Sequence, residues 1–146
     1  MPKTHVVAIG DLSARAGGQI SQHASHQSGR DVDIGLVYKR KPRGFPEMFV
    51  DATEANLDPR ATYELLRQFV ATAGTNGGVA VIFLDYRVQG WLYKWAHAHG
   101  IDEAVLRLTF QYPRGRDATA LVRHIPNHLD HMHVRFACPA ADRQCE

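Results

Sequence analysis

The sequence lacks long hydrophobic runs and a strong charge of either sign. No stretch approaches the roughly 18 apolar residues of a membrane-spanning helix, and the first residues do not combine a basic segment with a long apolar core, as export signals do. Seventeen Lys and Arg oppose fifteen Asp and Glu, which gives a formal net charge of +2. We therefore expect no membrane span and no nucleic-acid partner, because dedicated nucleic-acid binders carry a larger basic excess.

Cysteine is scarce as well. Cys138 and Cys145 are the two cysteines of the chain, too few for a disulfide-dense scaffold or a four-cysteine zinc site. They are compatible with one small-loop disulfide in an oxidising compartment, or with two reduced thiols. The residues alone leave both alternatives open.

The length and the periodicity predict one α+β domain. With 146 residues, of which 45% are hydrophobic, the chain suffices for a single domain over residues 1–146. We expect a mainly antiparallel central sheet flanked by two or three helices. Residues 39–46 are expected to form an exposed loop. The expected strands cover residues 32–38, 79–85 (buried on both faces and central) and 131–138, and the expected helices cover residues 58–74, 88–99 and 102–108.

Several common catalytic motifs are missing. The sequence has no H-E-x-x-H helix, no G-x-S-x-G elbow, no phosphate-binding G-x-x-x-x-G-K-[ST] loop and no G-x-G-x-x-G fingerprint. What it does have is nine histidines. They gather before the first expected strand and around the last one, whereas His5, His97 and His99 lie elsewhere and receive no predicted role.

The clustered histidines predict a zinc site on the sheet. His26 precedes Asp33 by seven residues, and a period of two places His131 and His133 on one face of the last strand. Asp33 lies in an otherwise apolar strand, where burial of a carboxylate is costly unless it is paired or bound to metal. Imidazole and carboxylate are favoured zinc ligands, and three protein ligands leave one position for a reactive water. His131 is placed to accept that water's proton.

Two other readings compete with a catalytic site. An isolated H-x-H pair is more often an ordinary surface or core pair than a metal site. Alternatively, His131, His133, Cys138 and Cys145 form a closed structural zinc site in a binding module. Strand parity argues against this second reading, because Cys138 would point away from the face that carries His133.

The motifs resemble a known family. The segment SHQSGRDVDI (residues 25–34), with His23 just before it, resembles the S-x-H-x-x-G-x-x-x-D motif of the lysostaphin, D-Ala-D-Ala peptidase and sonic hedgehog metallopeptidase group, and HMH (131–133) resembles its H-x-H motif. Together with HLDHMHVRFACPAADRQCE (128–146), the segment from His23 closely resembles the penicillin-insensitive murein endopeptidases. The resemblance is dense at both ends of the chain, and between residues 39 and 108 it holds only in pattern.

This resemblance implies residue roles. The zinc ligands fall on His26, Asp33 and His133, and the catalytic histidine falls on His131. His128 matches a further active-site histidine that orients groups or stabilises the oxyanion. His23 matches a histidine beside the site, either as an additional ligand or in the layer behind the ligands. The family's cysteine pairing implies a disulfide between Cys138 and Cys145.

The resemblance also implies a function. The expected activity is zinc-dependent hydrolysis of peptide cross-links in peptidoglycan, at the D-alanyl to meso-diaminopimelyl bond, without sensitivity to penicillin. A D,D- or L,D-carboxypeptidase, a phage-type endolysin, and a non-catalytic zinc-stabilised binding domain are the alternatives. The family predicts a periplasmic or otherwise exported protein, and the absence of a signal peptide then implies a removed leader or a phage-encoded enzyme.

Overall fold

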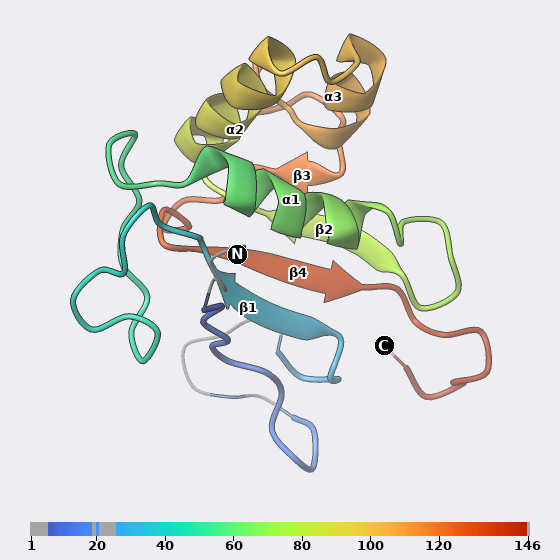
Figure 1. Ribbon diagram of the computed structural model, residues 1–146. Coiled ribbons are helices and arrows are strands. Elements are labelled where there is room, and N and C mark those ends of the chain that lie inside the picture. Colours follow the sequence, from blue (N-terminus) through green and yellow to red (C-terminus); the bar gives the residue numbers. More distant parts are fainter. Residues whose placement is uncertain (1–5, 19, 21–25, 146) are drawn as a thin grey trace.

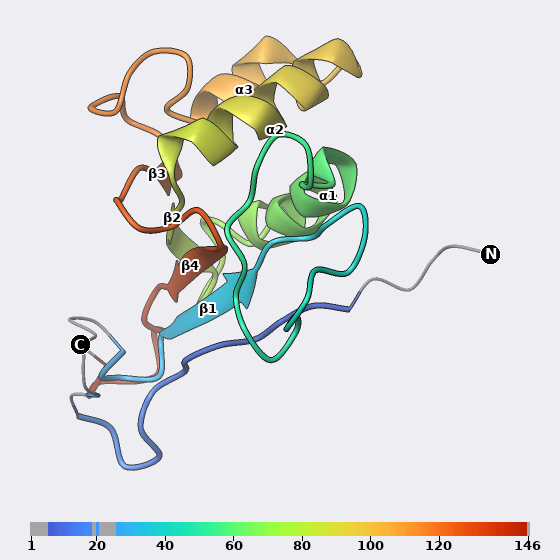
Figure 2. The same cartoon turned by 90° about the vertical axis from the view of Figure 1, so that its left-hand side faces the viewer.

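The structure, a computed structural model, describes residues 6–18, 20 and 26–145. Over these residues it contains one sheet and three helices (Figure 1). Figure 1 shows α1 lying along the sheet and α2 and α3 beyond its β3 edge, and the turned view in Figure 2 shows α1 to one side of the sheet. In chain order the elements are β1 (Asp31–Gly35), α1 (Pro59–Val70), β2 (Val79–Phe83), α2 (Tyr86–Ala98), α3 (Glu103–Thr109), β3 (Val122–Arg123) and β4 (His131–Phe136).

The sheet is mixed, with strand order β1-β4-β2-β3. β4 pairs antiparallel with β1 and with β2, whereas β2 and β3 run parallel. The α+β class with three helices agrees with the expectation, but the expected mainly antiparallel sheet is corrected by the parallel β2–β3 pair. The two-residue β3 was not predicted, because two residues are too few to show a period of two.

The segment before β1 covers the outer edge of that strand. The amide of Gly10 donates to the carbonyl of Asp33 at 2.8 Å, and the amide of Gly35 donates to the carbonyl of Ala8 at 2.8 Å. Gly10 allows a close approach, because a Cβ there would lie 2.4 Å from the ring of Phe49. The N-terminal segment is thereby held beside the strand that carries Asp33.

Each helix begins with an aspartate cap. The carboxylates of Asp58, Asp85 and Asp102 accept the backbone N–H of Ala61, Arg87 and Ala104, respectively, and such bonds satisfy amides that have no partner inside the helix. Asp85 was expected at the end of a strand, but its capping role starts α2 at Tyr86. None of the helices in the described part of the chain is long and apolar enough to cross a membrane.

Removing the α1 cap should destabilise the protein measurably. Asp58 Oδ1 accepts the amide of Ala61 at 2.9 Å, and Pro59 occupies the first turn. We expect Asp58→Ala to lower the free energy of unfolding by about 1 kcal/mol, the usual cost of losing such a cap. Urea unfolding would measure it, with Asp117→Ala, an exposed loop position, as a control that should leave the value unchanged.

The core lies between one face of the sheet and the helices. As the period of two in β4 predicted, Met132 and Val134 are fully buried and Phe136 packs against the core. The prediction that β2 is buried on both faces is wrong, because Ala80 is exposed. β2 is nevertheless internal in the sheet, as expected, since it pairs with β4 on one side and β3 on the other.

All three predicted strands are shorter than expected, and β1 and β4 end where their partners end. β1 stops at Gly35, which pairs with His131, the first residue of β4. Beyond it, Tyr38 forms one isolated bridge with Leu57. β4 stops at Phe136, and the next amide donates to the carbonyl of Gly78. Asp31, Asp33, His131 and His133 thus all lie in the paired part of β1 and β4.

Candidate metal centre

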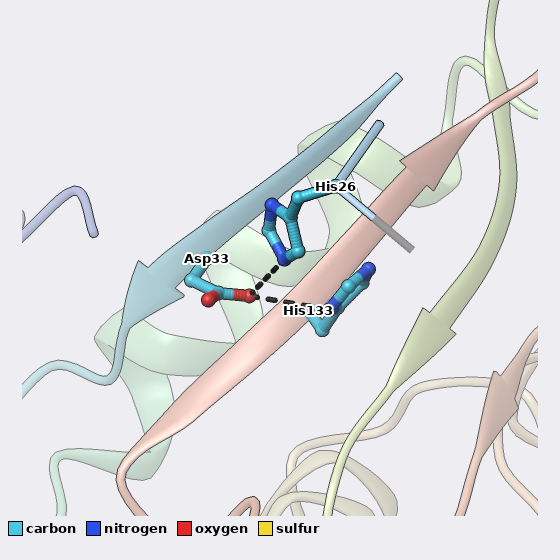
Figure 3. Close-up of side chains that lie close together, drawn as sticks. All are labelled: His26, Asp33 and His133. Atoms are coloured by element: carbon cyan, nitrogen blue, oxygen red, sulfur yellow. Dashed lines mark ion pairs between the residues drawn. The ribbon is translucent and has the colours of Figure 1, made fainter. Parts of the chain in front are cut away.

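The pairing of β1 with β4 brings together side chains that are 100 residues apart in sequence. Asp33 lies directly opposite His133 in the register, and His26 approaches from the segment before β1 (Figure 3). Asp33 Oδ1 lies 3.4 Å from His26 Nε2 and 3.2 Å from His133 Nδ1. All three residues are buried, and each offers one ligand atom within 4.8 Å of the others.

Hydrogen bonds behind the cluster set the tautomers of both imidazoles. His26 Nδ1 lies 3.0 Å from the carbonyl oxygen of Leu12, and His133 Nε2 lies 2.7 Å from Asp31 Oδ1. A carbonyl or carboxylate oxygen can only accept, so these two nitrogens carry the protons. The opposite nitrogens, His26 Nε2 and His133 Nδ1, therefore direct lone pairs toward Asp33.

The cluster therefore places three hydrogen-bond acceptors, two imidazole nitrogens and one carboxylate oxygen, around one point. Asp33 Oδ1 is buried and has no hydrogen-bond partner among the described residues, and a buried acceptor without a donor is costly. A cation between the two lone pairs and the carboxylate would satisfy all three groups. Two imidazoles and one carboxylate match the donor preference of zinc, so the residues present fit this metal.

The electrostatics of the cluster favour a charged carboxylate. Burial opposes ionisation of Asp33, but the contact with His133 and the nearby His131 and His26 outweigh it, so the pKa of Asp33 is lowered. For His133, burial acts to lower the pKa, but the contacts with Asp33 and Asp31 outweigh it and raise the pKa. The lowered pKa keeps Asp33 in the carboxylate form that a metal ligand requires.

His131 lies next to the cluster, and its Nδ1 is hydrogen-bonded to a neighbouring carboxylate. Its Nδ1 is 2.5 Å from Asp130 Oδ1, and its Nε2 is 3.7 Å from Asp33 Oδ1. The ring of Phe49 stacks on the imidazole with centroids 4.8 Å apart and planes 17° apart. Asp130 accepts the Nδ1 proton, which leaves Nε2 as the basic nitrogen on the side of Asp33.

His128 lies beside the imidazoles of both His131 and His133. Its ring centroid lies 4.5 Å from that of His131 and 6.2 Å from that of His133. Nδ1 donates to the carbonyl of Pro126 at 2.9 Å, so Nε2 is the nitrogen available to a bound molecule. Burial lowers the pKa of His128 and outweighs the opposing effect of the Pro126 carbonyl.

Of the residues named from the sequence, five are brought together: His26, Asp33, His128, His131 and His133. The remaining histidine, His23, lies outside the described residues. Cys138 and Cys145 form a disulfide with a Cα–Cα distance of 5.6 Å. The alternative of a closed zinc site that uses both cysteines is therefore wrong, because their sulfurs are bonded to each other.

Sequence reasoning missed two carboxylates of the site. Asp31 lies just outside the strand expected over residues 32–38, but it is a buried β1 residue that accepts from His133 and, at 2.8 Å, from Arg135 Nε. A period of two places it on the same strand face as Asp33, and that signal could have identified it. Asp130 precedes His131 in a loop, where no periodicity points to its partner.

Comparison with known proteins identifies a family. The family model described as penicillin-insensitive murein endopeptidase matches residues 2–146. The chain is 31% identical to the penicillin-insensitive murein endopeptidase of Pectobacterium atrosepticum, over 96% of this chain and 47% of that protein. It is also 31% identical to the proteins of that name from Yersinia enterocolitica, over 95% and 48%, and Klebsiella pneumoniae, over 96% and 48%.

A buried cluster of two histidines and one aspartate on a mixed sheet, with further histidines beside it, is a candidate metallohydrolase centre. The match over nearly its full length shows that the chain belongs to the penicillin-insensitive murein endopeptidase family. It spans about half the length of the curated relatives it matches.

Proposed function

We propose that this chain is a zinc-dependent endopeptidase that hydrolyses the peptide cross-links of peptidoglycan. The observation that carries the proposal is the convergence of His26 Nε2, His133 Nδ1 and Asp33 Oδ1, with both tautomers set by partners behind the rings. Family membership supports murein as the substrate. We further propose that residues 1–146 act as one metallopeptidase domain in an exported, periplasmic setting.

In this proposal His26, Asp33 and His133 hold the zinc ion, and His23, outside the described residues, is a further candidate beside them. When bound, zinc supplies Lewis-acid polarisation of the scissile carbonyl and activation of water. Asp31 keeps the His133 ring oriented, as carboxylates behind metal-bound histidines do. The carbonyl of Leu12 does the same for His26.

The two flanking histidines move and hold protons. His131 Nε2 accepts the proton of the attacking water and later delivers it to the leaving amine. Asp130, bonded to Nδ1, stabilises the imidazolium that forms in between. His128 orients the bound peptide by accepting a hydrogen bond at Nε2, because Nδ1 donates to Pro126 and the lowered pKa favours the neutral ring.

The proposed scissile bond is the D-alanyl to meso-diaminopimelyl amide. The proposed mechanism uses no serine nucleophile, so a β-lactam has no hydroxyl group to acylate. We therefore propose that hydrolysis is insensitive to penicillin. A carboxypeptidase with the same ligands would act on stem peptides instead of cross-links.

Digestion of cross-linked Gram-negative murein, with and without a chelator, tests the function. We expect chelator-sensitive conversion of cross-linked muropeptide dimers to monomers, identified by mass spectrometry, with benzylpenicillin having no effect. Loss of terminal D-alanine with intact cross-links would replace the proposal with a carboxypeptidase. Unchanged murein and stem peptides, with a chelator that lowers only the melting temperature, would favour a zinc-stabilised binding domain.

Asp31 should control metal affinity without contacting the metal. We expect Asp31→Ala to weaken zinc binding by about 10–100-fold, the usual range for partners of metal-bound histidines. Asp31→Asn should restore much of the affinity, because an amide oxygen still accepts from His133 Nε2. Competition with a fluorescent chelator measures both. Equal affinity of Asp31→Ala and the parent protein would remove Asp31 from this role.

A further inference from the structure

A strip of aromatic and basic side chains runs along α2, outside the metal centre. We use aromatic strip for Tyr86, Tyr93 and Tyr112 together with Lys94 and Arg116. The ring of Tyr112 lies between the other two, with centroids 5.4 Å from Tyr86 and 5.3 Å from Tyr93. Lys94 Nζ lies 5.9 Å from the Tyr112 centroid, and the guanidinium of Arg116 lies 5.7 Å from that of Tyr86.

The strip rests on a scaffold that holds its central ring. Gly90 of α2 lies beneath Tyr112, and a Cβ there would come within 3.1 Å of the ring. Gln111, which precedes Tyr112, is buried; its amide accepts the backbone N–H of His124 and donates to the carbonyls of Arg116 and Ala118. The segment that carries Tyr112 and Arg116 is therefore fixed against both α2 and the chain that leads to the metal centre.

The strip starts at the rim of that centre. The amide of Asp85 donates to the carbonyl of His128 at 3.1 Å, and the next amide, of Tyr86, donates to His124 Nδ1 at 3.0 Å. The rings of Tyr86 and His124 are also in edge contact. A polymer whose reacting bond lies at the metal centre would thus meet Tyr86 first and then Tyr112 and Tyr93.

The local charge is positive. Residues 86–124 contain six of the chain's 17 Lys and Arg but three of its 15 Asp and Glu, so they carry the basic excess of the sequence. Lys94 and Arg116 are exposed and take part in no ion pair within the described residues. Glu103, which bonds the hydroxyl of Tyr93, places a negative charge at the far end.

We propose that the aromatic strip binds the acidic, sugar-bearing strand of murein next to the cross-link that is cleaved. Aromatic faces pack against the apolar C–H faces of pyranose rings, with the partial negative charge of the ring toward those hydrogens. Lys94 and Arg116 are placed to pair with the carboxylates of neighbouring stem peptides along the same strand, which a single cross-linked peptide dimer lacks. The choice of ligand rests on the proposed function, whereas the strip itself rests on contacts within this chain.

A nucleic acid is disfavoured as the occupant. Affinity for nucleic acids comes chiefly from neutralising many phosphates, and the strip offers two unpaired cations. Its rings are also tilted by 54° and 60° to one another, whereas successive bases stack on aromatic faces that follow the strand. Sugar faces can pack on each ring separately, so they fit the tilted arrangement better.

The test compares two substrates and one binding readout. The double variant Lys94→Gln/Arg116→Gln removes the two exposed cations, and Tyr112→Leu removes the central ring while retaining apolar contact with Gly90. Arg60→Gln/Arg143→Gln is the matched control, with two exposed positive charges removed elsewhere. Each protein is assayed for sedimentation with purified murein sacculi, for hydrolysis of sacculi, and for hydrolysis of a sugar-free cross-linked peptide dimer.

We expect both strip variants to bind sacculi about tenfold more weakly, because the double variant loses two exposed ion pairs and Tyr112→Leu loses the central ring contact. Apparent KM on sacculi should rise accordingly, while kcat and hydrolysis of the sugar-free dimer stay within about twofold of the parent. Unchanged sacculus binding, or an equal loss of hydrolysis of sacculi and of the sugar-free dimer, would overturn the proposed role of the aromatic strip. If the parent protein cleaves neither substrate, the proposed function fails. The sedimentation assay still shows whether the aromatic strip binds murein. In a separate gel-shift assay with a DNA duplex, loss of DNA binding by the strip variants with sacculus binding intact would reassign the strip to nucleic acid.

Discussion

Asp33→Ala should abolish both metal retention and cross-link hydrolysis. Asp33 Oδ1 is the atom on which the lone pairs of His26 and His133 converge, and three protein ligands are the minimum of a catalytic zinc site. With two imidazoles left, we expect no stoichiometric zinc after gel filtration and turnover at the buffer background. Elemental analysis of the protein and muropeptide analysis of the digest measure the two effects.

The matched control for this change is Asp117→Ala. Asp117 is an exposed aspartate in the segment between α3 and β3, so the same substitution there should leave zinc content and turnover at parental values. A far-UV circular dichroism spectrum of each variant establishes that the fold persists. One zinc per chain in Asp33→Ala would refute the ligand assignment, whatever its activity.

His131→Ala should separate proton transfer from metal binding. His131 Nε2 faces the cluster, and its Nδ1 is held by Asp130. We expect zinc to be retained in full and kcat to fall by roughly 10²-fold or more, the usual scale for a positioned acid or base. Asp130→Asn should cause a smaller fall, because the amide still accepts the Nδ1 proton but no longer stabilises the imidazolium by charge.

His99→Ala is the control for the loss of an imidazole. His99 is exposed at the end of α2, stacks on Trp95 and lies outside the cluster. We expect parental kcat and zinc content. Near-parental turnover in His131→Ala would exclude this residue as the base, and loss of zinc together with turnover would make it a ligand instead.

Local signals predicted most of the fold. Helices expected over residues 58–74, 88–99 and 102–108 correspond to α1, α2 and α3, and α1 and α3 begin within one residue of the expected start. Errors arose where tertiary pairing decides. The parallel partner of β2 is only two residues long, which is too short to show a period of two. The strand pattern of residues 79–85 also does not reveal that Asp85 accepts the amide of Arg87 and caps α2.

The alternation of side chains along a strand predicts the facing of those site residues that lie on strands. Asp33 and His133 could be placed on faces by a period of two, whereas His26 was included for its spacing of seven residues from Asp33 and for the motif resemblance, since no periodicity connects it to the sheet. The register that sets Asp31 behind His133 and beside Arg135 depends on how β1 pairs with β4. Contacts made by loops, such as that of Phe49 with His131, leave no local signal.

Metal removal and stepwise restoration test the central claim most directly. The protein would be stripped with a chelator, dialysed, and titrated with zinc while cleavage of cross-linked muropeptide dimers is followed by mass spectrometry. We predict no cleavage without metal and a linear return of activity that saturates at about one zinc per chain, the stoichiometry of one three-ligand site. Full cleavage by the metal-free protein would contradict the account.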